Sequence, residues 1–96
     1  MTNVTCYTVK SSKRFESKIA KLLSEYKEVY VKYIDLFQPV GRGQYVDKLT
    51  LVCDGNEIIM REHHNTTPDD YRDMENMISV NNFTKRRILS IIESNI

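Results

Sequence analysis

The stretch "DKLTLVCDGNEIIMREHH", residues 47–64, decides the fold, because it predicts two strands joined by a tight turn. Apolar and polar residues alternate on both sides of Asp54-Gly55, a pair typical of a two-residue type I′ turn. A turn here fixes the register of the hairpin. The expected core-face pairs are Cys53/Asn56, Leu51/Ile58 and Leu49/Met60, and the expected pairs on the other face are Val52/Glu57, Thr50/Ile59 and Lys48/Arg61.

The same register creates a conflict near the open end of the hairpin. It places Asp47 opposite Glu62 and Tyr45 opposite His64 on the core side, and like charges directly opposite each other are unfavourable. Splayed and solvated strand ends, a bulge, a basic neighbour or a bound cation would relieve it. Carboxylates and imidazole also suit divalent metals and proton transfer, so Asp47, Glu62 and His64 are a candidate metal or acid–base site. Their spacing matches no specific metal motif, so we expect splayed ends, with His63 exposed.

The N-terminal part predicts a strand, a helix and a second strand. Residues 2–9, "TNVTCYTV", alternate and are rich in β-branched types, which favours a strand. Ser11 or Ser12 is a suitable N-cap for the helix that follows. Residues 29–37, "VYVKYIDLF", favour a central strand, the alternative being a helix that continues to Phe37. The helix should bury one stripe, formed by Phe15, Ile19, Leu22, Leu23 and Tyr26.

The segment "QPVGRGQ", residues 38–44, contains Pro39 and two glycines and predicts a loop with Arg42 at its tip. Towards the C-terminus, Thr67 as N-cap, Pro68 at the first position and Asp69-Asp70 in the first turn predict a helix. Its expected buried stripe is Tyr71, Met74, Met77 and Ile78. Asn81-Asn82 should break the pattern, and a last helix is expected from about Thr84, with Ile88, Leu89, Ile91, Ile92 and Ile96 as its apolar residues.

These elements follow one another in the order β-α-β-β-β-α-α. With 96 residues, the chain is expected to form a single domain over 1–96. Four strands can form one mixed sheet, and helices covering one of its faces would give a two-layer α+β fold. Because many unrelated proteins share such an order, the fold alone assigns no function.

The cysteines and the absence of signals indicate a cytoplasmic protein without a cofactor. Cys6 and Cys53 lie in strand-like runs, where we expect buried free thiols. A zinc site from both cysteines with His63 and His64 is disfavoured, because adjacent residues of a strand point to opposite faces. The chain has no signal-peptide pattern and no apolar run long enough for a membrane span.

Basic residues gather in three places. Lys10, Arg14, Lys18 and Lys21 form a ridge along the first helix, Arg42 stands at the loop tip, and Lys85-Arg86-Arg87 begin the last helix. The net charge of +1 argues against general coating of nucleic acid, but residues 1–48 carry +4 and residues 49–96 carry −3. These cations either solvate the surface, with Arg87 or Lys85 pairing with helix 67–80, or bind an anionic partner such as a phosphate backbone.

Six tyrosines and no tryptophan occur in the chain. If one face of the sheet is bare, Tyr7 or Tyr30 with Ile59 and Val52 would form an apolar patch, and such patches mark interfaces. The other interpretation is ordinary cross-strand pairing.

We therefore expect a non-enzymatic binding protein, a regulator or inhibitor of a protein partner, which forms a homodimer through the sheet face or helix 83–95. Its size and Asn/Lys/Ile-rich usage would suit a phage or mobile-element protein. The alternative is a nucleic-acid-binding regulator that uses the basic ridge and Arg42, which requires contiguous basic groups. The third is a small enzyme around Asp47, Glu62 and His64, which requires a pocket there.

Overall fold

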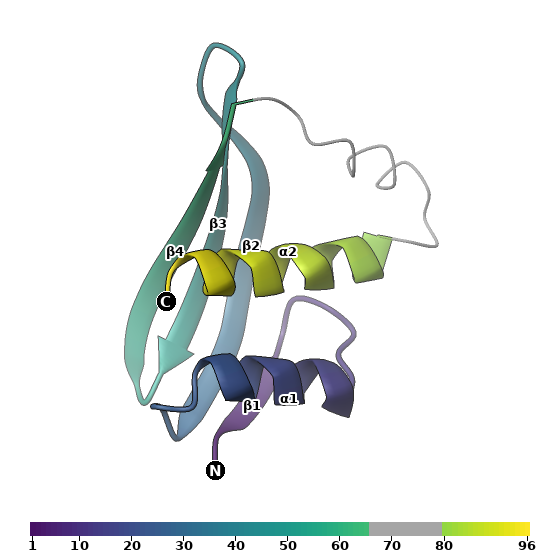
Figure 1. The fold of residues 1–96 in the computed structure, drawn as a ribbon, viewed down its shortest axis with the longest axis vertical. Coiled ribbons are helices and arrows are strands. Elements are labelled where there is room, and N and C mark those ends of the chain that lie inside the picture. Colours follow the sequence, from purple (N-terminus) through teal and green to yellow (C-terminus); the bar gives the residue numbers. More distant parts are fainter. Residues whose placement is uncertain (66–79) are drawn as a thin grey trace.

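The computed structural model describes residues 1–65 and 80–96 and shows an α+β domain. Four strands and two helices follow one another along the described chain (Figure 1). The elements are β1 (Asn3–Cys6), α1 (Lys13–Leu22), β2 (Glu28–Gly41), β3 (Gln44–Cys53), β4 (Asn56–His64) and α2 (Val80–Ser94). The helix expected over 67–80, with its cap at Thr67 and its stripe Tyr71, Met74, Met77 and Ile78, lies outside the described residues.

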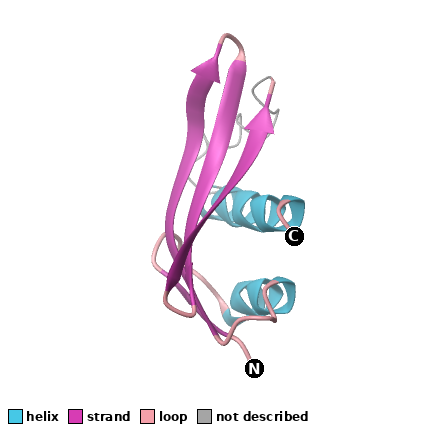
Figure 2. Cartoon of the chain, turned by 90° about the vertical axis from the view of Figure 1, so that its left-hand side faces the viewer, coloured by secondary structure: helices cyan, strands magenta, loops and turns pink. Residues whose placement is uncertain are grey.

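The sheet is mixed, and its strands lie in sequence order β1-β2-β3-β4. β1 runs parallel to β2, and the pairs β2–β3 and β3–β4 are antiparallel. Both described helices lie on the same side of the sheet, as Figure 2 shows from the edge. This is the two-layer arrangement expected from the sequence. Neither described helix combines the length and the apolar character of a membrane span.

The hairpin around Asp54-Gly55 has the predicted register at every position. Leu51 pairs with Ile58, and the register continues to Tyr45 and His64. Asp54 and Gly55 have φ of 50° and 85°, as a type I′ turn requires. The Asp54 carboxylate also accepts hydrogen bonds from the backbone N–H groups of Lys27, at 3.0 Å, and Glu28, at 2.9 Å. The turn therefore also holds the start of β2.

The loop expected over residues 38–44 is wrong, because β2 and β3 continue through it. β2 extends to Gly41, β3 starts at Gln44, and the turn between them consists of Arg42 and Gly43. Gly43 has φ of 68°, which favours glycine. A break in register between Pro39 and Gly41 accommodates the proline, since bulges tolerate its missing N–H. Arg42 nevertheless lies at the tip, as expected.

The core lies between the sheet and the helices. Ser12 caps α1 and accepts a hydrogen bond from the Phe15 backbone N–H at 3.3 Å. The stripe of α1 is confirmed, because Phe15, Ile19 and Leu23 are buried. The alternative of a helix running to Phe37 is wrong. Buried strand residues complete this core, chiefly Val29, Val31, Leu49, Leu51, Cys53 and Met60.

The start of the last helix also differs from the prediction. α2 includes Asn81 and Asn82, which were expected to separate it from the preceding helix, and its first described residue is Val80 rather than Thr84. The Asn81 side chain accepts a hydrogen bond from the Lys10 backbone N–H at 3.0 Å and donates one to the Lys10 carbonyl at 3.1 Å. This tertiary contact offsets the low helix propensity of asparagine. The buried face of α2 contains Phe83, Ile88, Ile91 and Ile92.

Candidate functional site

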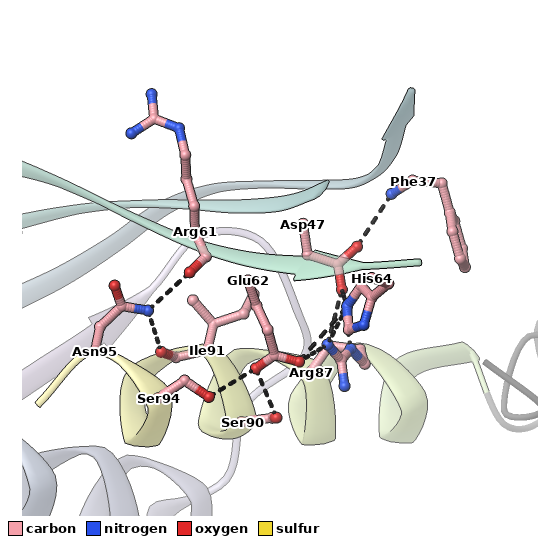
Figure 3. Close-up of polar contacts among 10 residues, drawn as sticks. All are labelled: Phe37, Asp47, Arg61, Glu62, His64, Arg87, Ser90, Ile91, Ser94 and Asn95. Carbon is pink, nitrogen blue, oxygen red and sulfur yellow. Dashed lines mark hydrogen bonds and ion pairs between the residues drawn. The ribbon is translucent and has the colours of Figure 1, made fainter. Parts of the chain in front are cut away.

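The three candidate residues at the hairpin end do come together, around Arg87 of α2 (Figure 3). Asp47 is fully buried, and its Oδ2 accepts hydrogen bonds from Arg87 Nε at 3.0 Å and Nη2 at 2.9 Å. Its Oδ1 accepts one from the Phe37 backbone N–H at 3.1 Å. His64 Nε2 lies 2.9 Å from Asp47 Oδ2. The buried carboxylate is thus satisfied on both oxygens.

Glu62 is bound by the same helix. Arg87 Nη2 donates to its Oε1, while Ser90 and Ser94 donate to its Oε2 at 2.9 and 3.0 Å. These three donors recur at i, i+3 and i+7, so they lie on one face of α2. One helix therefore supplies the positive charge and the hydrogen bonds that two facing strands need.

The pKa values show which effect prevails in this network. Burial raises the pKa of Glu62, but the bonds from Arg87, Ser90 and Ser94 overcome it and leave the pKa below its ordinary value. Burial lowers the pKa of Arg87, but the bonds to Glu62 and Asp47 overcome it and leave the pKa raised. Glu62 is therefore ionised and Arg87 charged at neutral pH.

The geometry corrects two predictions about this end of the hairpin. The strands do not splay, because they stay paired to Tyr45 and His64, and Asp47 is buried rather than solvated. A basic neighbour relieves the conflict, and that neighbour is Arg87, which had been expected either to be solvated or to pair with helix 67–80. Within residues 1–65 and 80–96, no three His, Cys, Asp or Glu side chains are placed to hold a metal ion.

His64 has two partners that compete for one nitrogen. Its Nε2 lies 2.7 Å from Arg87 Nη2, a donor, and 2.9 Å from Asp47 Oδ2, an acceptor. An unprotonated Nε2 can accept from Arg87, and a protonated Nε2 can donate to Asp47, but neither form does both. The three surface depressions formed by the described residues are lined by residues other than Asp47, Glu62 and His64. His63, on the other face, is exposed as expected.

Both thiols are free, as predicted, but only Cys53 is fully buried. Burial first, and the charge of Glu16 second, raise the pKa of the half-buried Cys6 to about 11. Burial also raises the pKa of Cys53. Since the thiolate is the nucleophile, neither cysteine is activated.

The structure brings four of the predicted partner-binding cations together. A groove of about 300 Å³ lies between α1 and α2, lined by Arg14 and Lys18 on one side and by Lys85 and Arg86 on the other. The two helices run side by side in the same direction there (Figure 1). Lys85 Nζ lies 5.5 Å from the centre of the Phe15 ring, which holds it over the groove.

The other predicted cations lie elsewhere. Lys21 lines a separate depression between α1 and β1, Arg42 lies at the β2–β3 tip, and Arg87 faces the buried carboxylates. Lys10 contacts Asn81 through its backbone. The basic residues therefore form one cluster of four rather than a continuous ridge.

The outer face of the sheet, opposite the helices, carries exposed aromatic side chains. Tyr7 and Tyr33 are 68% and 58% exposed, and Tyr7 stacks on Tyr30 with ring centres 6.1 Å apart. An open depression of about 800 Å³ is lined by these three tyrosines together with Thr8, Lys32, Ile34, Asp35 and Val52.

Two features of these surfaces were missed from the sequence. A bulge at Lys32 lets Tyr33 pair with Thr50, which turns Tyr33 to the outer face instead of the core. Simple alternation from Tyr30 could not show this. Ser90 and Ser94, which bind Glu62, were also missed. They follow Arg87 at i+3 and i+7, a spacing that places polar side chains on one face of a helix.

We predict that Arg87→Met lowers the free energy of unfolding by about 3 kcal/mol, because it leaves Asp47 and Glu62 buried without a counter-charge. The matched control is Arg14→Met, the same change on the exposed face of α1, with an expected effect within about 0.5 kcal/mol. Urea unfolding measures both. Equal effects of the two substitutions would contradict the assigned role.

Comparison with known protein families, with curated proteins and with solved structures finds no match at the level that would indicate a relationship.

Proposed function

We infer that this chain is a binding protein that docks a protein partner on the outer face of its sheet. The observation that carries the proposal is the open depression lined by Tyr7, Tyr30 and Tyr33 on a face that neither described helix covers. Contiguous exposed apolar surface of this kind marks interaction sites, and tyrosine is a preferred anchor at protein contacts.

The charges around the depression favour a protein over a nucleic acid on this face. Lys32 lies 3.9 Å from Glu57 across the sheet, and Asp35 stands directly opposite Lys48. Each of these cations thus has an acidic neighbour, and the face carries no excess of positive charge to attract phosphates. A neutral, aromatic surface suits a partner that presents an apolar side chain with polar groups around it.

The tyrosines also suit binding because part of their geometry is already fixed. The Tyr30 hydroxyl donates to Glu28 at 2.8 Å, and its ring is stacked on Tyr7. Side chains that are ordered before binding lose less conformational entropy when the partner arrives. Tyr33, which is 58% exposed and lines the same depression, would contact the bound side chain beside this stacked pair.

A photo-crosslinking amino acid at position 33 should capture the partner in the native host, whereas the same group at Glu93, an exposed position on α2, should not. With the captured protein purified, Tyr33→Ala should weaken binding at least about tenfold, as expected for an anchor residue. Glu93→Ala is the control and should leave affinity unchanged. Capture from both positions alike, or full affinity in Tyr33→Ala, would contradict the proposal.

The groove between the helices supports a second candidate function, binding of a nucleic-acid backbone. Arg14, Lys18 and Lys85 line it, and none of them has a salt bridge with the acidic residues of the described chain. The groove includes Ser12 and Arg14 at the N-terminal end of α1, where the partial positive charge of the helix adds to that of the cations. This satisfies in part the requirement that the basic groups be contiguous.

If this groove binds duplex DNA through these three cations, affinity should fall about 40-fold between 50 and 200 mM salt. Replacing Arg14 and Lys18 by Ala should reduce that fall to about fourfold. The matched control is Lys21→Ala with Arg42→Ala, which removes the same charge away from the groove and should leave the salt dependence unchanged. Equal effects of both double variants, or no binding at low salt, would rule out this candidate.

A further inference from the structure

The β4 edge differs from the other free strand edges of the described sheet. β1 is short, with four residues. The part of β2 that extends beyond its pairing with β1, residues 32–41, contains Pro39 and three breaks in its register with β3. Proline, bulges and shortness are the usual means by which edges avoid pairing with another chain. β4 has nine residues, no proline and an unbroken register with β3.

The hairpin geometry shows which backbone groups of this edge point outward. A two-residue turn makes Cys53 and Asn56 a hydrogen-bonded pair, so every second residue from Asn56 directs its backbone towards β3. Glu57, Ile59 and Arg61 therefore direct their N–H and C=O groups away from the sheet. The Arg61 carbonyl accepts a hydrogen bond from Asn95 Nδ2 at 3.0 Å and keeps a second lone pair.

The side chains of the same three residues are self-complementary. Glu57 and Arg61 are exposed and of opposite charge, and they flank Ile59, which is 39% exposed, at equal distances along the strand. In an antiparallel pair with Ile59 at the two-fold axis, each Glu57 lies opposite Arg61 of the second copy. Opposite charges directly across a strand pair are favourable, and identical ones are not.

We propose that two copies of this chain pair through β4, antiparallel, with Ile59 on the two-fold axis. The sheet then continues across the axis, with backbone hydrogen bonds between the outward groups and with two Glu57–Arg61 ion pairs. The 3.9 Å contact of Glu57 with Lys32 is long and exposed, so it leaves Glu57 able to face the second copy. This inference does not depend on the protein partner proposed above.

The test is a charge exchange followed by sedimentation velocity of the purified chain. Glu57→Arg puts arginine opposite arginine, and Arg61→Glu puts glutamate opposite glutamate, so each should raise the dimer dissociation constant at least about tenfold. An equimolar mixture of the two variants should recover dimers, because unlike charges then face each other. The double variant E57R/R61E should recover them as well.

Arg42→Glu is the matched control, since it makes the same charge change at the β2–β3 tip and should leave dimerisation unchanged. Circular dichroism of each variant checks that the fold is retained. A wild-type chain that stays monomeric up to about 1 mM, the weak end of specific association, would overturn the proposal. Dimers that ignore both single substitutions, or that fail to return in the mixture, would overturn it equally.

Discussion

The contact between the Arg87 guanidinium and the Asp47 carboxylate is the interaction on which the described fold most depends. It joins α2 to β3, and the same carboxylate accepts the backbone N–H of Phe37 in β2. Arg87 also reaches Glu62 of β4, so Arg87 and Asp47 together connect the helix with three strands. A buried ion pair of this kind adds little net stability over apolar packing, but removing one partner is costly. The network therefore specifies where α2 lies more than it strengthens the domain.

The position of α2 decides which surfaces remain for binding. Because Arg87 turns into the network, the neighbouring Lys85 faces the groove towards α1. Both described helices lie on one side of the sheet, so they leave its outer face, where Tyr7 and Tyr33 are exposed, uncovered. Asp47, Glu62 and His64 thus lie in the network that holds α2, and the candidate binding surfaces lie elsewhere on the domain.

The sequence predicted well what depends on local chemistry. The Asp54-Gly55 turn determined the register of a whole hairpin, and the stripe of α1 was readable from its period. The errors arose where tertiary contacts prevail over local preference. Asn81 lies within a helix because it binds the backbone of Lys10, and Pro39 lies within a strand because a bulge absorbs it. Arg87 could not be paired with Asp47 from sequence, since forty residues separate them and nothing local links them. The bulge at Lys32, which exposes Tyr33, left no signal in the alternation.

A double-mutant cycle on Asp47 and Arg87 tests most directly whether Arg87 is the counter-charge of the buried carboxylate. Asp47→Asn keeps an acceptor for the Phe37 N–H and removes the charge, and Arg87→Met removes the guanidinium while keeping a long side chain. The account predicts a coupling energy of about 2 kcal/mol in urea unfolding, with the double variant less destabilised than the sum of the single ones. Destabilisations that add to within about 0.5 kcal/mol would contradict it.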